Sequence, residues 1–319
     1  MTRPRPHPQP SDQESFVYGP VPSRRLGFSL GIDLLPYKTC SMDCIYCQLG
    51  PSPKKRVGRK ELVPVREVLA QIKRALAGGQ KIDCLTFSGS GEPTLHAGLG
   101  RIIAGIKRIT AIPVVVLTNS SLLSNPKVRR DLRAADIVVP SLDAVTPSVL
   151  AKVNRPHPSL NLVKIIDGLV RFRKEFKGQI WLEVMLVEGV NDGLPHLKKL
   201  KEAIALIKPD KVQLNTVVRP PAEKFARALS IEELENIKSF LGPTAEIIAD
   251  FGTRDQVPSD RDTGEAILST IKRRPMTAQD ISLSLGKPLE EVCAHLVRLV
   301  RQRRLKGLSH KGLEYYEPL

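Results

Sequence analysis

The feature that most constrains the fold is an alternation of short apolar runs with amphipathic segments, from about residue 30 to residue 250. Runs rich in β-branched residues predict strands at 30–35, 82–87, 113–117, 135–139, 180–186 and 211–215. Helical spacing of apolar residues, or a basic segment, separates them at 64–77, 99–109, 126–134, 162–177 and 194–207. Repeated strand–helix units imply a parallel sheet with right-handed crossovers. We therefore expect an α/β fold of six such units, as a barrel or an open doubly wound sheet, with a possible seventh strand at 246–249.

Polar residues follow five successive predicted strands at the point where each strand ends. They are a cysteine-containing loop, then the segments 88–93, 118–120, 141–143 and 189–192. The carboxyl ends of parallel strands meet at one edge of a sheet, and functional groups gather there in barrels and in open sheets. We expect these segments to form one site.

Three cysteines with CxxxCxxC spacing, Cys40, Cys44 and Cys47, follow the first predicted strand. Iron–sulfur clusters are usually held by four thiolates, and no fourth cysteine lies nearby, so the run predicts a [4Fe–4S] cluster with one iron open to a small molecule. The alternative is structural zinc, which needs four ligands, typically in two pairs. Neither Cys84 nor Cys293 belongs to a second pair, which disfavours zinc.

Composition bounds the class of protein and its location. The five cysteines are an odd number and no apolar signal segment or membrane span is visible, so we expect reduced thiols in a soluble, cytoplasmic protein. The chain has 319 residues, enough for one large domain and a smaller one. A net charge of +16 favours an anionic partner: nucleic acid, a phosphorylated substrate or an acidic electron donor.

The expected division is a disordered, basic, proline-rich arm at 1–18, a main domain at 19–255 that begins with a glycine- and proline-rich loop at 19–27, and a module at 256–319. In the module, helices are expected at 262–273, 277–286 and 288–303, the last with Val292, Leu296, Leu299 and Val300 on its inner face. Two short extended segments around residues 311–312 complete the pattern of a winged helix-turn-helix. Glu290 and Glu291 open the third helix and argue against ordinary docking in a DNA major groove.

The CxxxCxxC loop after a first strand, Tyr46 before the last cysteine, and a Gly-Glu-Pro turn at 91–93 after a second strand resemble the radical S-adenosylmethionine (radical SAM) superfamily over about residues 19–250. The segment around Arg24 and Arg25 resembles a largely uncharacterised subgroup near the enzymes that build wybutosine on tRNA. The resemblance implies a partial (β/α)6 TIM-like barrel, a [4Fe–4S] cluster and S-adenosylmethionine. It also implies reductive cleavage of that cofactor to a 5′-deoxyadenosyl radical that abstracts hydrogen, and an electron donor such as ferredoxin or flavodoxin.

The same resemblance implies roles for individual residues. Cys40, Cys44 and Cys47 would ligate the cluster. The turn Ser90, Gly91, Glu92 would receive the methionine amino group, with Ser90 in place of the family's usual first glycine. Further cofactor contacts would come from Tyr46 near the adenine, from Asn119, Ser141, Asp143 and Asn191, and from Arg155 at the carboxylate. For Tyr46 the alternative is ordinary core packing; for the polar residues it is a turn, a cap or a surface position.

The function expected is an enzyme acting on an unidentified substrate that the winged helix recruits, with RNA or a nucleic-acid-associated protein as the specific hypothesis. Arg24 and Arg25 are candidates to hold an anionic group of that substrate, and the basic run 54–60 to contact RNA phosphates or an acidic electron donor. The alternative class is a cluster-bearing regulator that binds nucleic acid without turnover. Such a sensor needs no S-adenosylmethionine pocket, so Glu92 and the strand-end residues favour the enzyme.

Overall fold

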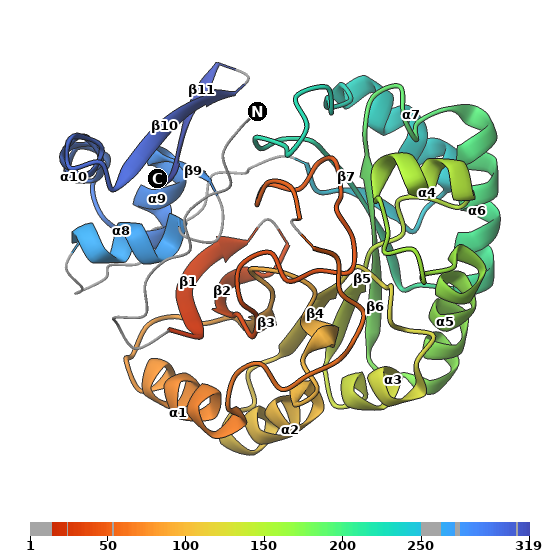
Figure 1. Cartoon of the computed structure of the whole chain (residues 1–319), viewed down its shortest axis with the longest axis horizontal. Helices are drawn as coiled ribbons and strands as arrows, with labels where there is room; N and C mark the ends of the chain where they lie inside the picture. Colours follow the sequence, from red (N-terminus) through yellow and green to blue (C-terminus); the bar gives the residue numbers. More distant parts are fainter. Residues whose placement is uncertain (1–14, 24, 53, 250–262, 272–274, 311) are drawn as a thin grey trace.

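The computed structural model describes residues 15–23, 25–52, 54–249, 263–271, 275–310 and 312–319. The larger part is one eight-stranded sheet in which each strand lies beside its sequence neighbour, from β1 to β8. The first pair is antiparallel and every later pair is parallel. Helices α1, α2, α3, α5 and α6 lie around the outer side of this sheet (Figure 1). The expected α/β fold with a parallel sheet is therefore confirmed.

The elements follow the predicted segments to within a few residues. The strands are β1 Val17–Ser23, β2 Gly27–Ile32, β3 Cys84–Phe87, β4 Val114–Thr118, β5 Ile137–Pro140, β6 Gln179–Leu186, β7 Lys211–Thr216 and β8 Ala245–Ile247. The helices are α1 Val65–Leu76, α2 Leu99–Ile109, α3 Pro126–Leu132, α4 Pro147–Val153, α5 Leu162–Glu175, α6 Leu194–Ile207 and α7 Ile231–Leu241, with a 3-10 turn η1 at Pro93–Leu95. Of these, α4 and α7 were not anticipated from the sequence.

The prediction is wrong at the N-terminal side of the sheet. Residues 19–27 were expected to be a loop and 1–18 an arm, but Val17–Ser23 forms strand β1 and Phe16 is buried in the core. Residues 1–14 of the predicted arm lie outside the described residues. Prolines in this strand are tolerated because β1 is an edge strand, where an amide N–H has no partner strand on one side. The strand expected at 30–35 ends at Ile32.

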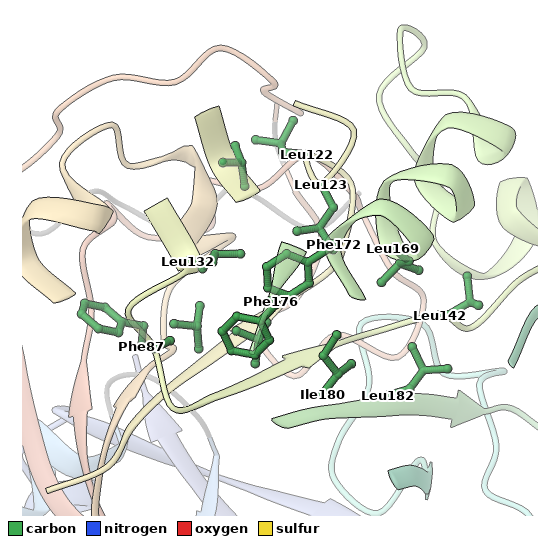
Figure 2. Packing of buried hydrophobic residues seen from close by; sticks show 14 of the residues in the cluster. Phe87, Leu122, Leu123, Leu132, Leu142, Leu169, Phe172, Phe176, Ile180 and Leu182 are labelled. Atoms are coloured by element: carbon green, nitrogen blue, oxygen red, sulfur yellow. The ribbon is translucent and has the colours of Figure 1, made fainter. Parts of the chain in front are cut away.

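The main hydrophobic core lies between the sheet and its outer helices. Phe172 and Phe176, at the C-terminal end of α5, stack with ring centroids 4.7 Å apart and face Ile180 and Leu182 of β6 (Figure 2). Phe172, Ile180 and Leu182 are fully buried. Burial of each such side chain contributes roughly 1.5–3 kcal/mol. This packing fixes the strands, and therefore the positions of the loops at their carboxyl ends.

A smaller C-terminal module has its own core and its own antiparallel sheet, in the order β10-β11-β9. Its elements are α8 Thr263–Ile271, β9 Met276–Thr277, α9 Ala278–Leu285, α10 Leu289–Arg301, β10 Leu305–His310 and β11 Leu313–Pro318. Thr277 caps α9 with a reciprocal capping box to Asp280. Val300, expected on the inner face of α10, is instead 37% exposed. The expected boundary at 255/256 falls outside the described residues.

The module packs beside strand β1, through α8 and α9 (Figure 1). The Tyr315 hydroxyl of β11 also donates a hydrogen bond to the Val218 carbonyl oxygen at 3.0 Å. Two segments of the larger part, β1 and the chain after β7, therefore contact the module.

Among the described helices, none has the length and apolar character needed to span a membrane.

Candidate cofactor site inside the curved sheet

A cavity of about 390 Å³ lies on the inner side of the sheet, toward the carboxyl ends of the strands. Residues from β1, β2, β3, β4, β6 and β7 line it, together with the cysteine loop and the turns after β3, β4 and β5. Its volume is within the range of small-molecule sites. Seven of the candidate site residues line this cavity: Cys40, Tyr46, Cys47, Gly91, Glu92, Asn119 and Ser141.

The cysteine loop is held against the turn after β3 by its backbone. Thr39 and Gly91 form a parallel bridge, and the Glu92 amide donates to the Thr39 carbonyl oxygen at 3.0 Å. A Cβ atom at Gly91 would lie 1.8 Å from that same oxygen. Glycine is therefore required here because two backbones approach closely.

Each of the three cysteine sulfurs accepts a hydrogen bond from a side-chain nitrogen. The pairs are Lys38 Nζ to Cys47 Sγ at 2.7 Å, Asn119 Nδ2 to Cys40 Sγ at 3.4 Å, and Asn154 Nδ2 to Cys44 Sγ at 3.4 Å. Among the described residues, no three His, Cys, Asp or Glu side chains converge on one metal ion. N–H donors to all three sulfurs are the contacts that the thiolate ligands of a cluster would receive.

Burial controls the protonation of the free thiols. It raises the pKa of Cys40 to about 11, with a smaller contribution from Glu92, and it also raises the pKa of Cys44. Burial lowers the pKa of Lys38, but the charges of the nearby cysteines outweigh that effect and the net shift is upward. Cys40 and Cys44 are therefore protonated near neutral pH in the free protein, and binding of a metal group would release their protons.

The Glu92 carboxylate is buried and already accepts four hydrogen bonds. They come from Thr94 Oγ1 at 2.5 Å and its amide at 3.1 Å, from Thr118 Oγ1 at 2.6 Å, and from the Asn119 amide at 2.6 Å. A carboxylate offers about four lone-pair sites. In this structure Glu92 therefore ties the turn after β3 to the end of β4, and burial raises its pKa.

Asp33 is a site residue that the sequence reasoning missed. Its carboxylate accepts hydrogen bonds from the Ser90 amide at 3.1 Å and the Ser90 hydroxyl at 2.6 Å. Gly89 has φ +137°, and a Cβ there would lie 2.5 Å from the Asp33 carboxylate. Asp33 thus shapes the turn that approaches the cysteine loop. Its position directly after the apolar run 30–32 was the available signal.

Tyr46 lines the cavity and is oriented by a buried carboxylate behind it. Its hydroxyl donates to Asp143 Oδ2 at 2.5 Å, and Asp143 also accepts from Asn154 Nδ2 at 2.6 Å and from the Met185 amide at 2.9 Å. Burial raises the pKa of Asp143 to about 6. Asp143 does not line the cavity, so it acts on Tyr46 and the end of β6.

The structure places two other candidates away from the cavity. Arg155 pairs with Glu223 at 2.5 Å, and neither residue lines the cavity. Asn191 is fully buried and binds the carbonyl oxygens of Asp143 and Met185, which closes the turn after β6. The cofactor contacts expected of Arg155 and Asn191 are therefore unsupported, because other parts of the chain already occupy these side chains.

Arg25 reaches into the cavity from the turn between β1 and β2. Its guanidinium pairs with Glu183 of β6 at 2.6 Å and donates to Gln213 of β7 at 2.9 Å. These two contacts join the β1–β2 hairpin to strands β6 and β7. An anion-binding role is weakened because Glu183 already compensates the charge of Arg25. Arg24 lies outside the described residues.

Comparison with known proteins gives several matches. The chain is 39% identical over 309 residues to the protein named GTPase Obg of Brachyspira hyodysenteriae; the match covers 94% of this chain but only 45% of that protein. It is 31% identical over 310 residues to the UPF0026 protein MJ1312 of Methanocaldococcus jannaschii, and the match covers 95% of each. A weaker match, 23% identical, covers 77% of this chain and 60% of the dual-specificity RNA methyltransferase RlmN of Bdellovibrio bacteriovorus.

Among solved structures, a radical SAM methyltransferase from Sphaerobacter thermophilus matches with a TM-score of 0.53 at 19% identity, over 69% of this chain and 65% of that one. At this identity the match shows the fold. The family model of the Radical SAM superfamily matches residues 34–200, just over half of the chain. The chain therefore belongs to the radical SAM superfamily and, within it, to the UPF0026 proteins, and its cofactors are a [4Fe–4S] cluster and S-adenosylmethionine.

Proposed function

We propose that this enzyme cleaves S-adenosylmethionine reductively and abstracts a hydrogen atom from an RNA substrate. One observation carries the proposal: a single cavity brings together two of the three cysteines, the turn Gly91–Glu92 and the side chains of Tyr46 and Asn119. When bound, the cluster supplies the electron and S-adenosylmethionine supplies the sulfonium–carbon bond that breaks to give the 5′-deoxyadenosyl radical.

The chain's own residues hold and orient these groups. Cys40, Cys44 and Cys47 would hold the cluster and leave one iron open for the amino acid end of S-adenosylmethionine. The turn containing Gly91 would hold the ammonium of that cofactor through its backbone carbonyl oxygens. This differs from a direct contact with the Glu92 carboxylate, whose lone pairs are already used by Thr94, Thr118 and Asn119.

The remaining cavity residues would hold the nucleoside part of the cofactor. Tyr46 offers an aromatic face, fixed by its hydrogen bond to Asp143. Asn119 and Ser141 offer polar groups at the ends of β4 and β5. Apolar side chains of the same cavity, including Leu117, Met185 and Val217, exclude water from the place where the radical would form.

An RNA substrate is supported by charge and by similarity. The net charge of +16 favours a polyanion. The weaker match to RlmN, named as an RNA methyltransferase, is consistent with this substrate class. We propose that the C-terminal module is a winged helix that holds the RNA. Its helix–strand order suits that fold, and Arg301 and Arg303 are exposed at the end of α10.

An external electron donor completes the reaction. Exposed cations at Lys54, Arg56 and Lys60 follow the cluster loop, and the Arg56 amide donates to the Cys40 carbonyl oxygen at 2.8 Å. A cationic surface so close to the first proposed ligand fits an acidic donor such as ferredoxin or flavodoxin.

The test is anaerobic reconstitution, reduction with dithionite, and measurement of 5′-deoxyadenosine formed from S-adenosylmethionine, with and without total tRNA and rRNA. We expect formation by the wild type, a higher rate with one of the RNAs, and none by Cys44→Ala. Cys293→Ala is the matched control because Cys293 is exposed in the module, and its yield should equal that of the wild type. A wild type with a verified cluster that forms no 5′-deoxyadenosine would refute catalysis, and a rate that no RNA changes would refute the substrate class.

A further inference from the structure

Lys38 is a buried cation in direct contact with a proposed cluster ligand. Its residue is 4% exposed and its Nζ lies 2.7 Å from Cys47 Sγ. The backbone at Lys38 has φ +58°, a left-handed conformation that costs a non-glycine residue roughly 1–2 kcal/mol. The fold therefore keeps Lys38 buried although burial removes the hydration of its ammonium and the backbone conformation is unfavourable.

A buried ammonium needs a negative partner to compensate its lost hydration. A cluster bound by Cys40, Cys44 and Cys47 would supply that charge beside Lys38, whose Nζ contacts Cys47 Sγ. A cluster held by three thiolates carries a net negative charge, and its reduction adds one more. The fold has thus placed a fixed positive charge where an electron must arrive.

We infer that Lys38 raises the reduction potential of the cluster by stabilising its reduced state through Cys47. The inference rests on the assignment of the cluster to the three cysteines. The attraction between a cation and the cluster grows when the cluster gains an electron, and it is weakly screened in a buried site. Lys38 is a positioning residue, because it acts through a ligand sulfur and does not line the cavity.

The other two donors to sulfur are expected to matter less. Asn119 and Asn154 are neutral, and their nitrogens lie 3.4 Å from the sulfurs of Cys40 and Cys44. Hydrogen bonds to cluster sulfurs also shift the potential, but charged donors are roughly twice as strong as neutral ones. Among the three donors, Lys38 is therefore the main electrostatic determinant.

The experiment is an anaerobic redox titration of the reconstituted enzyme, followed by the electron paramagnetic resonance signal of the reduced cluster. We expect a midpoint potential more negative than wild type in Lys38→Met and Lys38→Gln, and close to wild type in Lys38→Arg. Lys38→Gln keeps an N–H donor without the charge, so it separates the two effects. Lys54→Met is the control for an exposed cation in the neighbouring loop, and its potential should not move.

Several results would overturn the inference. An unchanged potential in Lys38→Met, with iron content equal to that of the wild type, would exclude an electrostatic role. If Lys38→Met assembles no cluster, the midpoint potentials of Lys38→Arg and Lys38→Gln are compared instead. Equal potentials in these two variants would refute the inference. A wild type that assembles no cluster would instead refute the ligand assignment, which is a separate outcome.

Discussion

Substitution of Gly91 by alanine should prevent the cysteine loop from docking. The added Cβ would lie 1.8 Å from the Thr39 carbonyl oxygen, and a separation below 3.0 Å is essentially never found for a real Cβ. The loop would have to retreat by about 1.2 Å, the difference between these two distances. The obstacle is backbone, so no rotamer change relieves it.

The retreat breaks the hydrogen bond from the Glu92 amide to Thr39, now 3.0 Å long. An unsatisfied buried N–H costs about 1–3 kcal/mol. Steric strain adds to this, so we expect Gly91→Ala to lower the free energy of unfolding by roughly 2–4 kcal/mol. Cys40 follows Thr39 directly, so the displaced loop also moves the first proposed ligand and cluster content should fall.

The assay is iron content after anaerobic reconstitution, together with urea unfolding of the same protein. Gly58→Ala is the matched control because no atom lies within 4 Å of the Cβ it would add. The control should retain the iron content and stability of the wild type. If Gly91→Ala also behaves like the wild type in both measurements, the account of loop docking is refuted.

Three further predictions concern the scaffold. Arg25→Met should destabilise the protein by about 2–4 kcal/mol in urea unfolding, because it removes the cation that compensates the largely buried Glu183 carboxylate. Arg25→Met combined with Glu183→Gln should lose less stability than Arg25→Met alone, and equal losses would contradict the pairing. Thr277→Ala should lower the stability of the C-terminal module by about 1 kcal/mol, because it removes the capping box of α9. Faster hydrogen exchange of the α9 amides would report this loss, and unchanged exchange would exclude the contribution of the cap. Burial lowers the pKa of His96, so as the pH falls the unfolded chain takes up a proton at this residue before the folded protein does. The stability that neutral His96 contributes at pH 7.5 is therefore lost below its ordinary pKa of 6.5. In urea unfolding, the advantage of wild type over His96→Gln should shrink between pH 7.5 and 5.5, and a constant difference would contradict this.

Local pattern predicted most of the sheet and of the helices around it, because each strand and helix carries its own signal. The helix at 99–109, for example, has Leu99, Ile102, Ile103 and Ile106 on one face, and all four are fully buried. Strand β1 was not predicted, because prolines in a short sequence window indicate a loop. The fold tolerates them because β1 is at the edge of the sheet. The position of a strand within a sheet is a property of the whole fold.

The candidate site could also be predicted only in part from the sequence. The cysteine spacing and the Gly-Glu-Pro turn at 91–93 were visible in the sequence, and the close approach of Thr39 explains the glycine. The partners of Glu92, Arg155 and Asn191 were not visible. Arg155 pairs with the distant Glu223, Asn191 binds the distant Asp143 as well as the nearby Met185, and the contacts of Glu92 also involve β4. Residue type showed that these groups bind something, but only the fold shows what they bind.

Binding of S-adenosylmethionine to the open iron can be followed in the electron paramagnetic resonance spectrum of the reduced, reconstituted enzyme as the cofactor is added. If three cysteines hold the cluster and the cofactor takes the open iron, the protein should bind about four iron atoms and the spectrum should change on addition of S-adenosylmethionine to a saturating end point. Cys44→Ala should show no such cluster. A spectrum that saturating S-adenosylmethionine leaves unchanged would contradict the claim that the missing fourth ligand is this cofactor.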